Sequence, residues 1–261
     1  MTSPQRAIVI GAGRGSRLKH LTDDIPKTLV PVLGRPMLES ILEALAAGGF
    51  GRQDVTFICG YRKEVVQGRY PDLEYVENVD WESNNILASL LCARERMKGG
   101  FVSTYADIVY RPAVVEALVK AEGDLVLAVD TDWRRRYAGR TQHPENDAEK
   151  LVARGGRVER ISRTIPAEEA TGEFIGVMKA TPRGAEAFIA AFDAVRAEVG
   201  DDGVFREGRI FRKAYLLDML AHLAESGVEM HTVDTHGGYM EIDTLQDEQL
   251  AATWWAGGSA G

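Results

Sequence analysis

The chain has 261 residues, 45% of them hydrophobic, so it can bury a sizeable core and lacks the composition of a disordered protein. Its formal net charge of −8 argues against nucleic-acid binding, which usually depends on a basic surface. The sequence contains no apolar run of the length that a signal peptide or a membrane span requires. We therefore expect a cytoplasmic protein that binds neither nucleic acid nor membranes.

The first 130 residues alternate short apolar runs with segments of helical periodicity. The runs that predict strands are 7–10, 55–59, "LEYVEN", "FVSTYAD" and "DLVLAVD"; helices are predicted at 37–47, from Tyr61, in "NNILASLLCARERM" and in "PAVVEALVKAE". The stretch 31–36 is expected to be a loop. Cys59 and Cys92 lie in apolar segments and are expected to be reduced core residues. The alternation predicts a mostly parallel sheet with helices on both faces.

The pattern changes after Asp130. Residues 131–150 are polar and basic without a clean period, and "KLVARGGRVERIS" predicts a hairpin that turns at Gly155 and Gly156. The later elements are a strand in "EFIGVMKA", helices in "RGAEAFIAAFDAVRAEVG" and "IFRKAYLLDMLAHLAESG", short strands in "VEMHTVD" and "GGYMEID", and a helical tail. No linker divides the chain, so we expect one domain over 1–261. The apolar segment 216–223 could be core or interface, which leaves room for a homo-oligomer.

The loop after the first strand, "GAGRGSRLKHLTDDIPKTLVPV", fails two familiar phosphate-binding fingerprints. The dinucleotide motif G-x-G-x-x-G requires glycine where Ser16 stands, and its acidic residue on a second strand is missing. The P-loop motif requires glycine and lysine at Ser16 and Arg17. A simple packing turn is the alternative. Backbone N–H groups of a glycine-rich path, with Arg17 and Lys27 nearby, favour a cradle for a polyphosphate.

These residues resemble the signature of the nucleotidyltransferases that activate sugar 1-phosphates and related phosphorylated small molecules. The family pattern G-x-G-x-R-[LF] followed by P-K-x-[LM]-x-P-[VI] is met, with one extra loop residue, by Gly11, Gly13, Gly15, Arg17, Leu18, Pro26, Lys27, Leu29, Pro31 and Val32. The likeness continues at "YAD" and "YMEID". The segments "SNNILASL", "TDWRRRYAGRTQHPENDAEK", "GEFIGVMK" and "GGYMEIDT" are most similar to cytidylyltransferases of phosphocholine and of phosphonates.

The resemblance implies an α/β fold with a Rossmann-like, mixed but mostly parallel sheet, flanked by helices and carrying an inserted hairpin or acceptor subregion. It also implies that residues 1–130 mainly bind the nucleotide and residues 131–261 mainly bind the acceptor. In the implied reaction an acceptor oxyanion attacks the α-phosphorus in line and pyrophosphate leaves. The attacking group is already ionised, so charge neutralisation and alignment are the main tasks.

The resemblance gives roles to the residues of the first loop. Lys27 is expected to stabilise charge on the α-phosphate, although an ordinary solvated lysine is the alternative. Arg17 is expected to hold the leaving pyrophosphate together with the loop. The loop residues predicted to bind the nucleotide are Gly11, Ala12, Gly13, Gly15 and Ser16.

Carboxylates later in the chain are expected to bind Mg²⁺, which prefers oxygen ligands. Asp107 follows a predicted strand, and the resemblance pairs it with Asp243. Glu241 lies two residues before Asp243, so in a strand both would face one side while Ile242 faces the other. Glu241 is therefore expected to assist directly or through water. A helix cap ahead of Pro112 is the alternative role of Asp107.

The base and the acceptor are assigned from further segments. Asn84, Asn85 and Ser89 could hydrogen-bond a pyrimidine, although asparagine at a helix start is also a common N-cap. Aromatic residues could form a cage for a quaternary ammonium group; these are Trp81, Tyr110, Trp133 and Tyr137. A basic cluster competes with them and favours an anionic acceptor, with a solvated loop as alternative: Arg134, Arg135, Arg136, Arg140 and His143. The predicted acceptor-binding residues are Trp133, Arg136, Tyr137, Arg140, Arg163 and Lys179.

Arg163 stands where relatives usually have a lysine that meets the acceptor phosphate, which leaves the acceptor undecided. The sequence thus predicts a Mg²⁺-dependent enzyme that transfers CMP from CTP to a small phosphonate or phosphocholine-like acceptor. One alternative is a sugar-1-phosphate nucleotidylyltransferase that uses UTP, dTTP or GTP. Another is a non-catalytic, nucleotide-binding regulatory protein. The joint presence of Arg17, Lys27, Asp107 and Asp243 argues against the latter.

Overall fold

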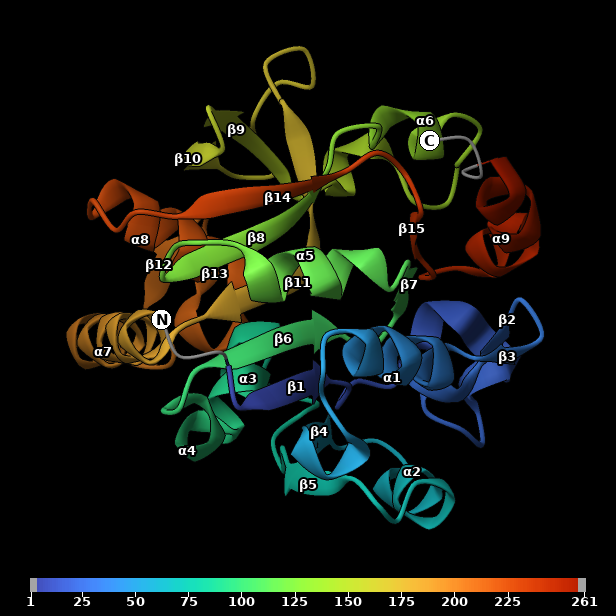
Figure 1. Ribbon diagram of the computed structural model, residues 1–261. Helices are drawn as coiled ribbons and strands as arrows, with labels where there is room; N and C mark the ends of the chain where they lie inside the picture. The colour runs from blue at the N-terminus through green and yellow to red at the C-terminus, as the bar shows by residue number, and fades with distance from the viewer. Residues whose placement is uncertain (1–3, 258–261) are drawn as a thin grey trace.

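A nine-stranded mixed sheet forms the centre of the computed structural model, which describes residues 4–257 (Figure 1). In spatial order its strands are β5 (Glu74–Glu77), β4 (Val55–Cys59), β1 (Arg6–Ile10), β6 (Phe101–Tyr105), β11 (Gly172–Ala180), β8 (Leu125–Asp130), β14 (His231–Thr235), β10 (Arg157–Ile161) and β9 (Lys150–Arg154). Strands β5, β4, β1 and β6 pair in parallel, as do β8 and β14. Strand β11 runs antiparallel to both β6 and β8. The expected α/β fold with a mixed sheet is confirmed, and its parallel pairings are confined to β5–β4–β1–β6 and β8–β14, because β11, β10 and β9 pair antiparallel to their neighbours.

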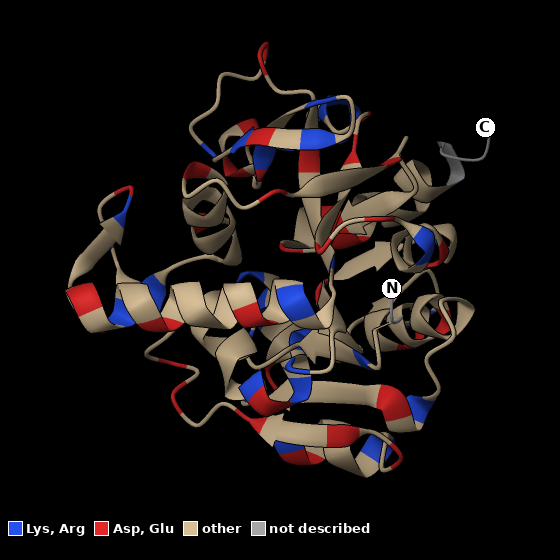
Figure 2. Ribbon diagram, turned by 60° about the vertical axis from the view of Figure 1, so that its left-hand side comes forward, with Lys and Arg blue, Asp and Glu red and all other residues tan. Residues whose placement is uncertain are grey.

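Helices of very different length surround this sheet. They are α1 (Met37–Ala47), α2 (Lys63–Arg69), α3 (Ile86–Cys92), α4 (Arg94–Met97), α5 (Ala113–Lys120), α6 (Arg134–Tyr137), α7 (Pro182–Val199), α8 (Leu216–Glu225) and α9 (Leu245–Gly257). Helices α1 and α5 pack against each other, whereas α8 contacts both α3 and α7. In the described part of the chain, no helix combines the length and apolar composition that a membrane-spanning segment needs. Acidic and basic residues are interspersed over the helices and loops (Figure 2).

Three two-stranded ribbons lie outside the main sheet: β2 (Pro31–Val32) with β3 (Arg35–Pro36), β7 (Ile108–Tyr110) with β15 (Tyr239–Glu241), and β12 (Val204–Arg206) with β13 (Arg209–Ile210). The first ribbon corrects the expectation of a loop over 31–36. Leu33 and Gly34 both have positive φ angles, 54° and 82°, as a tight two-residue hairpin turn requires. The second ribbon joins the middle of the chain to its last quarter.

A second hydrophobic cluster holds this ribbon against the first loop and α9. Leu18 and Ile242 are both fully buried in it, although 223 residues separate them. Leu18 directly follows Arg17 and Ile242 directly precedes Asp243, and the sequence predicts that both charged residues belong to the site. Burial of Leu18 and Ile242 together therefore brings those charged neighbours into the same region.

Three other expectations need correction. The helix predicted in 84–97 is divided at Ala93 into α3 and α4. Helix α8 begins at Leu216, later than the apolar pattern suggested, because the Asp218 carboxylate accepts the Tyr215 N–H at 2.8 Å and caps the helix there. Cys59 is buried as expected, but Cys92 is exposed.

Candidate active site

The loop after β1 lines a pocket of about 310 Å³ with Gly11, Ala12, Gly13, Gly15, Ser16 and Arg17. Gly15 has a φ of 71°, and a Cβ there would lie 2.6 Å from Cδ of Lys27. Only glycine therefore allows the loop and Lys27 to lie this close. A Cβ on Gly13, by contrast, would meet nothing within 4 Å. The backbone at Gly13 consequently faces open space, where a ligand can approach.

Lys27 lies in a short 3₁₀ turn, Lys27–Leu29, directly after the extended Pro26. Its side chain is buried, and its Nζ donates hydrogen bonds to Asp243 and, at 2.7 Å, to Oδ2 of Asp107. Burial opposes the charged form, but the carboxylates of Asp107, Asp243 and Glu241 outweigh it and raise the pKa of Lys27. Lys27 is therefore a permanent cation at neutral pH.

Arg17 provides the second cation of the pocket. Its guanidinium donates to Oδ2 of Asp243 at 2.5 Å, while more than half of the Arg17 side chain stays exposed. Burial alone would raise the pKa of Asp243, but Lys27 and Arg17 lower it to about 2. Asp243 is thus an ionised carboxylate held between two cations.

The β7–β15 ribbon brings three carboxylates to one place. Asp107 lies in the bend between β6 and β7, and its carbonyl accepts the Ile242 N–H at 2.9 Å. Glu241 and Asp243 line the same pocket, while Ile242 between them is fully buried in the second cluster. Glu241 and Asp243 therefore face the pocket while Ile242 faces the core, as their spacing in the sequence predicts.

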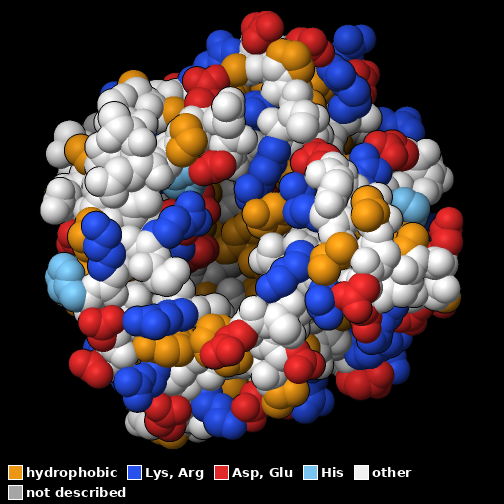
Figure 3. Space-filling model, turned by 180° about the vertical axis from the view of Figure 1, so that it is seen from behind, with side chains coloured by type: hydrophobic (Ala, Val, Ile, Leu, Met, Phe, Trp, Pro, Cys, Tyr) orange, Lys and Arg blue, Asp and Glu red, His pale blue; other side chains and the backbone are white. Residues whose placement is uncertain are grey.

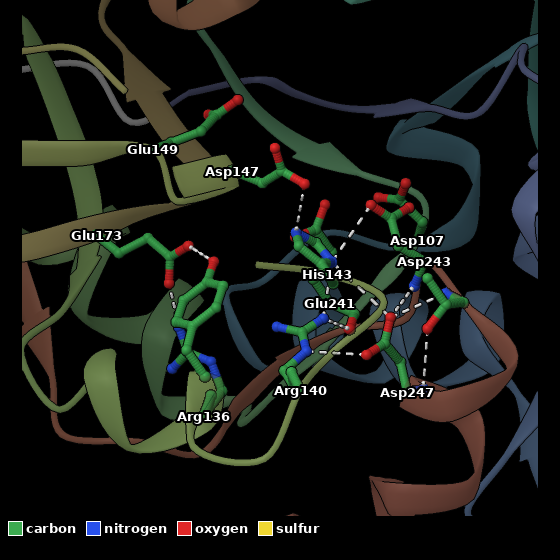
Figure 4. Close-up of polar contacts among 12 residues, drawn as sticks. Asp107, Arg136, Arg140, His143, Asp147, Glu149, Glu173, Glu241, Asp243 and Asp247 are labelled. Atoms are coloured by element: carbon green, nitrogen blue, oxygen red, sulfur yellow. Dashed lines mark hydrogen bonds and ion pairs between the residues drawn. The ribbon is translucent and has the colours of Figure 1, made fainter. Parts of the chain in front are cut away.

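His143 lies beside these carboxylates, and its ligand atoms are within 4.8 Å of those of Glu241 and Asp243 (Figure 4). Arg140 lies 2.8 Å from Nδ1 of His143, and an arginine can only donate. Nδ1 therefore accepts, and the ring proton of neutral His143 is on Nε2, which lies 3.5 Å from Glu241 Oε2. In this tautomer His143 supports Glu241 rather than offering a lone pair to a metal.

The carboxylates of Asp107, Glu241 and Asp243 could hold a divalent metal ion. Their oxygen atoms are the ligands that a hard cation prefers. Burial and the neighbouring carboxylates of Asp243 and Asp107 raise the pKa of Glu241 well above its usual range. Such an excess of negative charge is what a bound cation would relieve, so the residues fit a metal of this class.

Asp247, at the start of α9, lies beside Asp243 and holds its backbone in place (Figure 4). Its fully buried carboxylate accepts the backbone N–H groups of Asp243 and Thr244, at 3.0 and 2.8 Å, and the Nε–H of Arg140 at 2.9 Å. Asp247 is not among the residues predicted from the sequence. The signal that could have found it is "TLQD", in which Thr244 and Asp247 have the spacing of a helix-capping box.

A second pocket, of about 330 Å³, adjoins the first. Both are lined by Arg17, Asn85, Ile86, Asp107 and Asp243. The second pocket is also lined by Tyr105, His143, Asp147, Glu149, Arg163, Glu173, Phe174, Tyr215, Tyr239 and Glu241. Seen from behind, the molecule has a central hollow with basic and acidic side chains at its rim (Figure 3). The arrangement offers room for two ligands that meet at Arg17, Asp107 and Asp243.

Arg163 lies in the second pocket, where it is held by two neighbours. Its Nη2 donates to Oε1 of Glu149 at 3.0 Å, and its guanidinium stacks over the Tyr215 ring at 4.0 Å. Tyr105 donates to the other Glu149 oxygen at 3.1 Å. The buried Nε of Arg163 has no hydrogen-bond partner among the residues that the structure describes. Arg163 lines this pocket, so its guanidinium can offer positive charge to an anion there.

Comparison with known proteins identifies the family. Residues 7–230 match the family model described as the MobA-like NTP transferase domain. The chain belongs to this family. It is therefore a nucleotidyltransferase.

Curated relatives of the transferase act on several acceptors. It is 27% identical to the CTP:phosphoglutamine cytidylyltransferase of Campylobacter jejuni, over 94% of this chain and 98% of that protein. It is 36% identical to CMP-5'-(3-aminopropyl)phosphonate synthase of Streptomyces rubellomurinus, over 54% of this chain and 26% of that longer protein. The chain thus covers nearly the full length of the first relative but about a quarter of the second.

Solved structures show the same fold. The CTP:phosphocholine cytidylyltransferase of Streptococcus pneumoniae superposes with a TM-score of 0.70 at 23% identity, covering 95% of this chain and 98% of that one. The inositol-1-phosphate CTP transferase of T. maritima gives a TM-score of 0.71 at 19% identity, covering 99% of both chains.

The predicted base-binding residues Asn84, Asn85 and Ser89 all line the first pocket. Asn85 is also the N-cap of α3, because its Oδ1 accepts the Ile86 N–H at 2.9 Å. Asn85 therefore has the N-cap role that was the alternative to base binding, and this role does not exclude contact with a ligand.

Five predicted acceptor-binding residues line neither pocket of the transferase: Trp133, Arg136, Tyr137, Arg140 and Lys179. Their placement is a correction. Arg136 is buried between Asp130 and Glu173, Tyr137 donates to Glu173 at 2.6 Å, and the Lys179 ammonium donates to the Ala121 carbonyl.

The basic segment divides into two parts. Arg136 and Arg140 are buried beside carboxylates that are distant in sequence, and the partner of Arg140, Asp247, lies 107 residues later. Arg134 and Arg135 are exposed, as the alternative of a solvated loop expects. The proposed aromatic cage does not form. Trp133 packs on Tyr137 at 5.9 Å, Tyr110 is buried, and Trp81 lines the first pocket.

Proposed function

We propose that the transferase moves CMP from CTP to a small phosphonate or phosphocholine-like acceptor and releases pyrophosphate. The observation that carries the proposal is the pair of adjoining pockets that share Arg17, Asp107 and Asp243. The pocket with the glycine loop suits the triphosphate. The pocket with Arg163 suits the acceptor, whose oxyanion would meet the α-phosphorus where the pockets join.

The chemistry in this proposal is a single displacement at phosphorus. An oxygen of the acceptor forms a bond to the α-phosphorus, and the bond from that phosphorus to the pyrophosphate oxygen breaks. Lys27 stabilises the charge that develops on the α-phosphate, and Arg17 with the glycine loop stabilises the leaving pyrophosphate. Lys27 does not act as a base, because its neighbours raise its pKa. No proton needs to move, since the attacking oxygen is already ionised.

Mg²⁺ is the proposed cofactor. Asp107 and Asp243 would hold the ion. Glu241 would assist them, and His143 would help to position Glu241. When bound, the ion would neutralise phosphate charge and help to align the triphosphate.

The acceptor pocket supports an acceptor that carries an ammonium group as well as a phosphoryl or phosphonyl group. Six carboxylates line this pocket, and Arg17 and Arg163 are its only arginine or lysine side chains from the described residues. Its aromatic residues are Tyr105, Phe174, Tyr215 and Tyr239. Carboxylates and aromatic faces both attract ammonium ions. The relatives named above for aminopropylphosphonate and phosphocholine act on compounds of this kind.

Pyrophosphate release tests the proposal. Purified protein is supplied with Mg²⁺, one of CTP, UTP, dTTP or GTP, and one of phosphocholine, 2-aminoethylphosphonate or glucose 1-phosphate. We expect release with CTP and an ammonium-bearing acceptor, and a CMP adduct by mass spectrometry. Release only with glucose 1-phosphate would replace the proposal by a sugar nucleotidylyltransferase. No release with any pair would overturn the proposed class of acceptor.

A further inference from the structure

Asn78 is a buried asparagine behind the nucleotide pocket, directly after β5, and it does not line that pocket itself. Only 1% of the residue is exposed. Its side-chain amide makes four hydrogen bonds, which uses both N–H groups and both lone pairs of the amide. The four partners are the Asp80 N–H at 3.1 Å, the Asn84 Nδ2 at 2.9 Å, the Asn84 Oδ1 at 2.9 Å and the Ser89 Oγ at 2.8 Å.

The backbone fixes which way this amide points. The Asp80 N–H can only donate, so the atom of Asn78 that faces it must be Oδ1. The Asn78 Nδ2 group must then face Ser89 and Asn84. The Asn84 amide forms a reciprocal pair with that of Asn78, so its orientation is fixed as well.

Ser89 receives its hydrogen-bonding role from Asn78. Its Oγ accepts from the Asn78 Nδ2, which leaves the hydroxyl hydrogen of Ser89 to be donated elsewhere. No described residue accepts that hydrogen, and Ser89 lines the nucleotide pocket. The pocket therefore presents a hydrogen-bond donor at Ser89, although serine alone could equally present an acceptor.

We propose that Asn78 is a positioning residue that sets the base preference of the nucleotide pocket. In this proposal the Ser89 hydroxyl, held as a donor, donates to N3 of the base, which is an acceptor in cytosine; O2 accepts in both pyrimidines and does not separate them. Uracil carries a hydrogen on N3, which a donor at Ser89 opposes. The inference rests on the proposed use of CTP, and it adds the residue that selects the base.

Equilibrium binding of CTP and UTP without acceptor tests the proposal, because it does not depend on turnover. Asn78→Asp replaces the donating Nδ2 by a carboxylate oxygen, so the Ser89 hydroxyl turns to donate to that carboxylate. We expect the ratio of CTP to UTP affinity to fall at least tenfold. Asn146→Asp is the matched control, since Asn146 is exposed, lines neither pocket and undergoes the same change of charge; its ratio should stay that of the wild type.

A double-mutant cycle shows whether Asn78 acts through Ser89. Ser89→Ala alone should weaken the binding of CTP more than that of UTP. Asn78→Asp should lower the ratio of CTP to UTP affinity much less in the Ser89→Ala background than in the wild type. A merely structural role of Asn78 would weaken both nucleotides alike. If Asn78→Asp does not fold, as judged by its melting curve, Ser89→Ala decides alone: an equal loss for the two nucleotides overturns the proposal.

The outcomes separate this inference from the proposed function. An unchanged ratio in Asn78→Asp, with wild-type protein that prefers CTP and releases pyrophosphate from it, overturns the role of Asn78 only. Wild-type protein that prefers UTP overturns both. A lowered ratio supports the inference even if the acceptor turns out to be different.

Discussion

Lys27 shows how one residue takes its properties from distant parts of the chain. Pro26 before it and Gly15 facing it are local features that the sequence displays, and they place the side chain. Its two carboxylate partners follow 80 and 216 residues later. Burial together with these carboxylates keeps the ammonium charged, which suits stabilisation of a phosphate and excludes proton abstraction at neutral pH.

We predict that Lys27→Ala lowers kcat by roughly 10²-fold or more, because an aligned cation at the reacting phosphate is lost. Lys98→Ala is the control, since Lys98 is exposed and pairs with Glu95 on the surface. Because the pKa of Lys27 is raised, the wild-type rate should not fall through loss of this charge between about pH 6 and pH 9. Steady-state pyrophosphate release measures both effects. Turnover of Lys27→Ala within threefold of wild type would remove Lys27 from the mechanism.

The residues that the sequence could predict are those that stand in a spaced motif or at the end of an apolar run. Arg17, Lys27, Asp107, Glu241 and Asp243 belong to this group, and the structure brings all five together. The residues that it could not predict take part through tertiary contacts alone. Glu149 and Tyr215, for example, sit in unremarkable segments, and only the fold places them around Arg163.

At the scale of elements, the N-terminus of α9 supports the predicted metal ligands. Asp247 caps this helix and holds the backbone of Asp243, while Arg140, from the loop after α6, balances its charge. Arg140 also reaches His143. The sequence predicts α9 and the basic segment separately, but their pairing depends on an orientation of the two that no periodicity reveals.

We predict that Asp247→Ala weakens Mn²⁺ binding about tenfold, the scale of effect known for residues that orient metal ligands. Electron paramagnetic resonance titration of Mn²⁺, without nucleotide, measures it. The matched control is Asp218→Ala, because Asp218 likewise caps a helix start and pairs with an arginine, Arg209. Both variants should lose stability, but only Asp247→Ala should change the Mn²⁺ affinity. Equal affinities in the two variants would contradict the supporting role of α9.

At the scale of the whole molecule, the sheet was predictable and its closure around the site was not. Alternating strands and helices in the first half indicate parallel pairing, as observed for β5, β4, β1 and β6. The β7–β15 ribbon consists of two three-residue strands that are far apart in sequence, and although a strand is predicted in "GGYMEID", nothing in the sequence indicates that it pairs with β7. This ribbon nevertheless determines where Asp107 and Asp243 meet.

We predict that the two ends of the chain stabilise each other through the second hydrophobic cluster. Ile242→Ala should cost about 2–5 kcal/mol, as for other fully buried isoleucines. It should also speed amide exchange selectively in 16–32 and 245–251. Leu223→Ala, in the main core, is the control and should lower global stability without this selectivity. Hydrogen exchange with mass spectrometry distinguishes the two patterns, and equal exchange in both variants would show that the ends are independent.

The pairing of Arg17 and Lys27 with Asp243 has a consequence for how the protein is made. During synthesis the glycine loop emerges first, yet its cations find Asp243 only after more than two hundred further residues have left the ribosome. Until then two basic side chains lie beside an incomplete pocket. The nascent chain can build much of its sheet early, but it cannot complete the proposed reaction centre before the segment that leads into α9 has been translated.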